Sequence, residues 1–161
     1  MPESLSTRLK RWGFNLFPAF RGTGAWLTHL DDDWREVRLR LPLSWRTRNY
    51  VGTIFGGSMY AAVDPIYMIM LIHRLGEGYE VWDKAARIRF LRPARETLHA
   101  RFTLPDRELE AIRRELGDDP RTDRVYEVEL AAADGTVHAR VEKTVHVRRR
   151  GPSAGDGTGG G

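Results

Sequence analysis

One carboxylate in a long apolar stretch is the side chain best placed to do chemistry. Residues 49–73, NYVGTIFGGSMYAAVDPIYMIMLIH, turn almost wholly apolar after two glycines, and Asp64 lies in their middle. An ionisable group in such a helix is costly unless it is paired or used. We therefore expect Asp64 to act as a general base on water or as a direct nucleophile. The structural alternative is a helix cap, because Asp followed by Pro65 is a common pair at a helix start.

The residues just before this carboxylate could hold a developing negative charge. Amides at a helix N-terminus point outward with partial positive charge, and glycines permit close approach. We expect the Gly57 amide to be an oxyanion donor, with Gly56 beside it. The alternative is that the two glycines only let the helix start pack closely. Asn49 could orient water or a carbonyl, although Asn is also an ordinary turn residue, and Ser58 could hydrogen-bond a ligand.

Lysine is rare in this chain, so each lysine attracts attention. Of 26 Lys and Arg residues, only Lys10, Lys84 and Lys143 are lysines. Strict alternation along residues 80–93 places Lys84 on the inward face with Trp82, where it could reach Asp64 within a subunit or across a dimer and lower its pKa. A buried structural pair and a solvent-exposed Lys84 are the alternatives. Lys143 also falls on the inward register of the last strand, where it could snorkel or mark a bulge.

These residues need elements to position them, and the hydrophobic pattern supplies an order. It predicts an amphipathic helix over 4–16, a loop over FPAFRGTG, and a peripheral helix over 105–116 ending near Gly117. Strands are expected at residues 25–30, 37–41, 80–93, 97–104, 124–133 and 137–147. The connections are short, which favours antiparallel neighbours. The expected fold is therefore α+β: an antiparallel sheet of about six strands wrapped around a long central helix, with an N-terminal helix and one short inserted helix.

Composition narrows the class of protein. The length suits one domain, expected over residues 1–150, followed by a disordered Gly-rich tail over 151–161. The chain has no cysteine, so thiolate metal sites and disulfides are excluded, which is compatible with a cytoplasmic location. The net charge of +4 comes without a basic face or a nucleic-acid-binding module. Residues 54–72 approach membrane-span length, but Gly, Asp and Pro interrupt them. The five histidines show no metal-ligand spacing.

The element order, together with GTIFGGSMYAAVD at the central helix, resembles the hotdog-fold acyl-CoA thioesterases. Many of these carry Asn, a loop, His-Gly-Gly, and an acidic residue seven positions beyond the second Gly. Asn49, Phe55-Gly56-Gly57 and Asp64 match that pattern, apart from Phe55 in place of His. The resemblance covers about residues 12–149, and VWDKAARIRFLRP is its other specific part. The combination is similar to a bacterial branch of unknown function labelled tetrameric acyl-CoA thioesterase-like.

The resemblance implies an acyl-CoA thioesterase-like hydrolase that takes a coenzyme A thioester as substrate and needs no cofactor. Its site would lie between paired subunits, so a homodimer or homotetramer is expected, with pairing along the strand edge at residues 80–93. Phe55, Gly56, Ser58, Lys84, Arg89 and Arg92 would contact substrate, the arginines through phosphates, unless those arginines only form a solvated strand face. Phe55 in place of His favours a non-catalytic acyl-ligand binder or sensor. A third reading, an enoyl hydratase or dehydratase, usually wants a His beside the acid.

Overall fold

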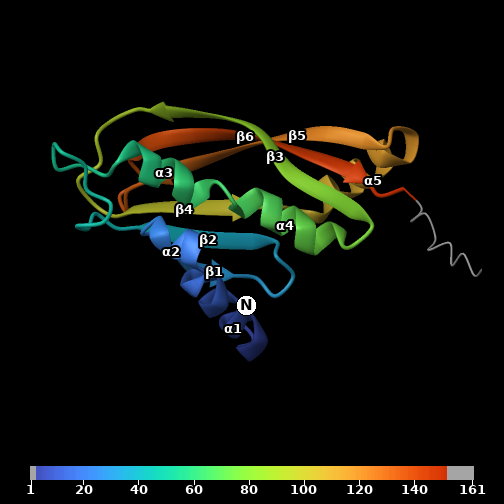
Figure 1. Ribbon diagram of the computed structural model, residues 1–161, viewed down its shortest axis with the longest axis horizontal. Helices are drawn as coiled ribbons and strands as arrows, with labels where there is room; N and C mark the ends of the chain where they lie inside the picture. Colours follow the sequence, from blue (N-terminus) through green and yellow to red (C-terminus); the bar gives the residue numbers. More distant parts are fainter. Residues whose placement is uncertain (1–2, 152–161) are drawn as a thin grey trace, which may run out of the picture.

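The computed structural model describes residues 3–151 and shows an α+β fold built on one sheet (Figure 1). The expected tail over 151–161 lies almost wholly outside the described residues. The helices are α1 (Leu5–Leu16), α2 (Pro18–Gly22), α3 (Gly56–Val63), α4 (Ile66–Leu75) and α5 (Asp106–Asp118). The strands are β1 (Trp26–Leu30), β2 (Glu36–Leu41), β3 (Tyr79–Phe90), β4 (Leu98–Thr103), β5 (Arg121–Ala131) and β6 (Val137–Arg149).

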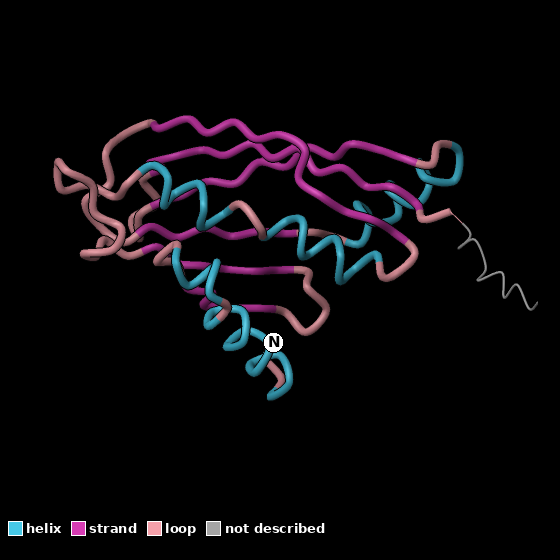
Figure 2. Tube along the Cα trace, viewed as in Figure 1, coloured by secondary structure: helices cyan, strands magenta, loops and turns pink. Residues whose placement is uncertain are grey.

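The sheet has six strands in the order β1-β2-β4-β5-β6-β3, with every described neighbour antiparallel. Strand β3 is therefore an edge strand, although it is central in the sequence. In Figure 2 the two central helices lie one after the other along the sheet. The core is made by alternate residues of the strands packed against these helices, such as Phe102 of β4 and Val141 of β6 with Met70 of α4. This confirms the expected hotdog-type arrangement.

The central helix is broken in the middle, at the acidic residue. Helix α3 ends at Val63 and α4 begins at Ile66, so Asp64 and Pro65 form the joint. Proline has no N–H to continue the helical hydrogen bonds and crowds the turn before it. Both joint residues nevertheless keep right-handed helical φ and ψ, and the Asp64 amide still bonds the Tyr60 carbonyl at 2.9 Å. The helix is therefore interrupted at this joint, and Asp64 ends the first segment rather than capping the second.

Three local expectations are wrong. Residues 18–22 form the short helix α2 and not a loop, because Pro18 suits a first helical position. Helix α5 runs through Gly117 to Asp118. Most important, β3 carries a register shift between Asp83 and Ala85. A β-bulge adds one residue to a strand and so reverses the alternation on one side of it.

Candidate functional site

Asp64 is held by two hydrogen-bond donors at the joint between α3 and α4. Lys143 Nζ of β6 lies 2.5 Å from Asp64 Oδ1, and the Tyr60 hydroxyl donates to the same oxygen at 2.7 Å. The Lys143 side chain is 1% exposed, whereas that of Asp64 is 42% exposed. Within residues 3–151 no hydrogen bond falls on Oδ2 of Asp64. One carboxylate oxygen is thus fixed and the other is open to a solvent or ligand contact.

A second carboxylate shares the buried lysine. Asp83 Oδ1 of β3 lies 3.2 Å from Lys143 Nζ, within ion-pair distance, yet this buried oxygen accepts no hydrogen bond from the described residues. Lys143 also sits 5.3 Å from the centre of the Tyr60 ring. Asp64, Asp83, Lys143 and Tyr60 therefore form one polar cluster, which we call the Asp64 cluster. It joins the central helix to β6 and β3, which are the last two strands in the sheet order.

The cluster drives the pKa values of its two carboxyl groups in opposite directions. Burial tends to raise the pKa of Asp64, but hydrogen bonds from Lys143 and Tyr60 outweigh it and bring the pKa below its usual value. Burial raises the pKa of Asp83, and Lys143 offsets this only in part. Burial disfavours a charged Lys143, but the two carboxylates reverse that effect and raise the lysine pKa. Two carboxyl groups with separated pKa values are the arrangement that lets one stay ionised for base chemistry.

Lys84 does not take the position that alternation predicted for it. Because of the register shift, Asp83 shares the inward face with Val145, and Lys84 lies at the shift. The Lys84 ammonium binds Asp123 of β5 at 2.6 Å, and Asp123 also binds His146. The expected pairing of Lys84 with Asp64 is therefore wrong within one subunit, where Lys143 is the lysine that pairs with Asp64. Trp82 is likewise on the outward face, with its ring 4.4 Å from that of His146.

The glycine pair begins α3, and no side chain caps that helix start. A methyl group at Gly56 would lie 2.8 Å from Phe90 Cζ, and one at Gly57 would collide with the Phe55 ring. The two rings thus cover the glycines from either side, and each is 57% exposed. A side chain at either position would force the neighbouring aromatic ring to move, so the glycines allow the rings their close approach to the helix start.

An open cavity of about 480 Å³ lies beside this helix start. Ile54, Met59, Phe90 and Leu91 give it an apolar wall, and its remaining lining residues are Asn49, Thr53, Gly56, Arg92 and Pro93. Of the predicted contact residues, Asn49, Gly56 and Arg92 line this cavity. Arg89 lies on the opposite face of β3 from Phe90, because successive strand residues alternate. Ser58 is not among the lining residues of this cavity, so a contact of Ser58 with substrate stays a prediction.

Asn49 uses its side chain to close its own loop. The amide nitrogen donates to Thr53 Oγ1 at 2.7 Å, and the amide oxygen accepts from the Thr53 and Val51 backbone N–H groups. This is the turn-forming behaviour typical of Asn. Asn49 therefore shapes the loop before the glycine pair, and a direct role on substrate stays a prediction.

Residues 3–151 contain no group of three or more His, Asp or Glu side chains arranged to hold a metal ion. Over the same residues, no helix combines the length and apolar character needed to cross a membrane. The Asp64 cluster offers two carboxylates, an ammonium and a phenol for chemistry, and it lies at the end of the helix that begins beside the open cavity.

Comparison with solved structures identifies the class of fold. PA5026 from Pseudomonas aeruginosa, a protein of unknown function and probable thioesterase, superposes with a TM-score of 0.78 at 21% identity, covering 92% of this chain and 99% of that one. Thioesterase HI1161 from Haemophilus influenzae gives 0.65 at 16% identity, with 92% and 93% covered. A mutant of thioesterase PA1618 from P. aeruginosa gives 0.66 at 15% identity, with 93% and 97% covered. The chain therefore has the same fold as these proteins, the hotdog fold.

The family can be stated more narrowly. A sequence model of the family described as a domain of unknown function, DUF4442, matches residues 6–147. The match spans α1 through most of β6, so it includes the glycine pair and all four members of the Asp64 cluster. The chain belongs to this family. A search of curated proteins finds no match.

Proposed function

We propose that this protein is an acyl-CoA thioesterase in which the Asp64 carboxylate activates water. The observation that carries the proposal is the open Oδ2 of a carboxylate whose Oδ1 is held by Lys143 and Tyr60. A base needs a lone pair free to accept a proton and a charge that persists at working pH. The lowered pKa of Asp64 supplies the second condition. The likeness to thioesterases of the same fold supports the choice of substrate class.

The spacing of Gly57 and Asp64 disfavours direct attack by the carboxylate within one subunit. Gly57 and Asp64 are seven residues apart, which places them on one helix face but about 10 Å apart along the axis. An oxygen bound to the Gly57 amide would therefore hold its thioester carbon too far from the carboxylate of the same subunit for a bond to form. Either a water molecule bridges that gap, or Asp64 serves the glycine pair of a second subunit.

A second subunit has a suitable place on the molecule. β3 is an edge strand, and an exposed edge offers unpaired backbone groups to another chain. Phe90 and Leu91 are exposed where β3 ends, and Tyr50, Val51 and Phe55 are exposed on the loop before α3. Pairing of β3 edges in a homodimer would cover apolar surface beside the cavity and exclude water from it. The proposed active enzyme is therefore a homodimer, or a tetramer of such dimers.

A non-catalytic acyl-CoA binder is the second candidate, and Phe55 favours it. In this chain Phe55 occupies the position at the helix start where many of the hotdog-fold acyl-CoA thioesterases that it resembles have His. One polar contact to the thioester is therefore missing. The hydratase alternative has less support. Among the described residues, His138 contacts the Pro93 carbonyl and His146 contacts Asp123, so neither joins the Asp64 cluster.

Turnover of an acyl-CoA panel tests the proposal. Hydrolysis of acyl-CoA releases coenzyme A as a free thiol, and because the chain contains no cysteine, a thiol reagent can follow this release without background from the protein. We expect thiol release that saturates with acyl-CoA. Saturable binding of acyl-CoA without thiol release would instead identify the binder.

Replacing Gly57 separates an oxyanion role from a packing role. In Gly57→Ala the new methyl collides with the Phe55 ring, whose exposed end can move, so we expect a stability change below about 1 kcal/mol. We expect turnover to fall about tenfold or more, because the methyl obstructs approach to the amide. The double variant Gly57→Ala/Phe55→Ala removes the collision and keeps the methyl. Full recovery of turnover in the double variant would show that Gly57 serves packing alone.

A further inference from the structure

Helix α1 packs on the protein with its polar face and turns its apolar face to solvent, which is the reverse of an ordinary amphipathic helix. Its apolar residues Leu5, Leu9, Trp12 and Leu16 fall within about 60° of one another on the helix. Leu5 is 77% exposed, Leu9 74%, Trp12 48% and Leu16 53%. Phe17 follows the last residue of the helix and is 63% exposed. We call these five residues the α1 stripe; contiguous apolar exposure of this kind marks an interaction surface.

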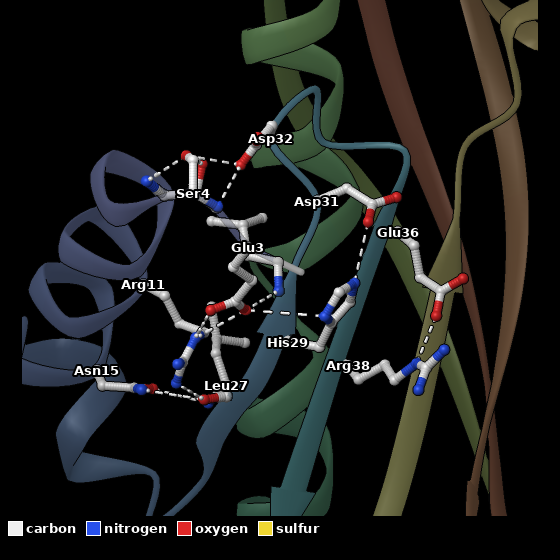
Figure 3. A network of polar contacts seen from close by, with 12 residues as sticks. Glu3, Ser4, Arg11, Asn15, Leu27, His29, Asp31, Asp32, Glu36 and Arg38 are labelled. Carbon is white, nitrogen blue, oxygen red and sulfur yellow. Dashed lines mark hydrogen bonds and ion pairs between the residues drawn. The ribbon is translucent and has the colours of Figure 1, made fainter. Parts of the chain in front are cut away.

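The opposite, polar face fixes α1 to the sheet edge (Figure 3). The Asn15 side chain exchanges two hydrogen bonds with the backbone of Leu27 in β1, at 2.7 and 3.1 Å, and Asn15 is buried. Arg11 donates to the same Leu27 carbonyl at 3.3 Å. Ser4 caps the helix and donates to Asp32 at 2.9 Å. These contacts are specific enough to hold the α1 stripe outward, so its exposure follows from how the helix is docked.

The charged side chains of the helix itself all have one sign. Residues 5–22 contain Arg8, Lys10, Arg11 and Arg21 and no Asp or Glu. Among the ion pairs of residues 3–151, only Arg11 of this segment takes part, with Glu3 at 3.0 Å. Arg8 and Lys10 are exposed and lie on opposite sides of the α1 stripe. Leucine and aromatic side chains flanked by cations form the pattern of a helix that lies in a lipid surface.

We propose that the α1 stripe docks this protein on an anionic lipid surface. The helix has 12 residues and is about 18 Å long, so it would lie in the headgroup region and not span the bilayer. Trp12, which meets Trp26 edge-on at 6.1 Å, would sit at the interface where tryptophan is favoured. A second copy is a poorer occupant. Two paired stripes would bring Arg8 and Lys10 of both copies together, with no acidic residue on the helix to compensate.

Vesicle sedimentation tests this proposal with the full chain. We expect the wild type to bind vesicles of phosphatidylglycerol and phosphatidylcholine, and to bind pure phosphatidylcholine vesicles at least tenfold more weakly. Leu9→Ser/Trp12→Ser should lower binding to the anionic vesicles about tenfold or more, and so should Arg8→Glu/Lys10→Glu. Val125→Ser removes an equally exposed apolar side chain from β5 and should bind as the wild type does.

Two outcomes would overturn the proposal. The first is that the wild type does not bind anionic vesicles at all. The second is that light scattering shows the Leu9→Ser/Trp12→Ser variant to have a smaller assembly than the wild type, which would assign the α1 stripe to a second copy. Circular dichroism of each variant ensures that a loss of binding is not a loss of fold. Thioesterase turnover in solution plays no part in this test, so the proposal stands or falls independently of the proposed activity.

Discussion

The Asp64→Asn variant should lose about 10²-fold or more of its acyl-CoA turnover while still binding acyl-CoA. Asparagine has nearly the shape of aspartate, but its amide cannot accept a proton from water at neutral pH. The residue also keeps an oxygen for the Lys143 and Tyr60 donors, so the joint between α3 and α4 should persist. The change does weaken the ion pair of a buried lysine, and we expect a stability loss of about 1–2 kcal/mol. Thiol release and thermal unfolding measure the two effects separately.

Asp123→Asn is the matched control for that experiment. Asp123 also binds a lysine, Lys84, but it lies on the opposite face of the sheet from the Asp64 cluster. We expect Asp123→Asn to retain turnover within about twofold, since surface ion pairs contribute little. If Asp64→Asn turned over acyl-CoA as fast as the control, the water-activating role of Asp64 would be excluded. If the wild type, Asp64→Asn and Asp123→Asn all bound acyl-CoA with equal affinity and the wild type released no thiol, the protein would be a non-catalytic acyl-CoA binder.

The sequence was sufficient to predict the six strands, the helices other than α2 and the position of the acidic joint, because these depend on local chemistry. Proline after Asp64 predicts a break, and the alternation in β2, β4 and β6 predicts their inward faces. The same reasoning failed where a single inserted residue changed the register. Nothing in VWDKAARIRF identifies the shift between Asp83 and Ala85, because every residue there also fits unbroken alternation.

The register shift in β3 alters the predicted site more than any difference in the bounds of the elements. Unbroken alternation places Lys84 inward and Asp83 outward, whereas in the structure Asp83 is inward and Lys84 is outward. A signal for the true partner was present, since Lys143 falls on an otherwise apolar inward face of β6. A lysine on such a face requires a carboxylate nearby. Following that requirement from Lys143 to the one carboxylate of the apolar stretch would have paired it with Asp64.

Lys143→Met should therefore produce the largest stability loss of any single change in the Asp64 cluster. It leaves Asp64 and Asp83 as neighbouring carboxylates without their shared cation. Breaking a buried pair costs about 3–5 kcal/mol, and we expect about 2–3 kcal/mol because Asp64 is 42% exposed. The loss should shrink on acidification. Without the ammonium the pKa values of both carboxyl groups rise, so protonation relieves their repulsion at a higher pH than in the wild type.

The pH dependence of turnover shows whether Lys143 keeps Asp64 ionised for catalysis or serves only the stability of the fold. In the wild type the lowered pKa of Asp64 keeps the base ionised, so its contribution to stability and turnover is present above its ordinary pKa of 3.8 and is lost as pH falls through the lower folded value. In Lys143→Met we expect the acid limb of kcat/KM to move to higher pH, with Lys84→Met as a control that leaves it in place. An unchanged acid limb in a folded Lys143→Met variant would contradict the assignment, because a lysine needed only for packing cannot set the protonation of Asp64.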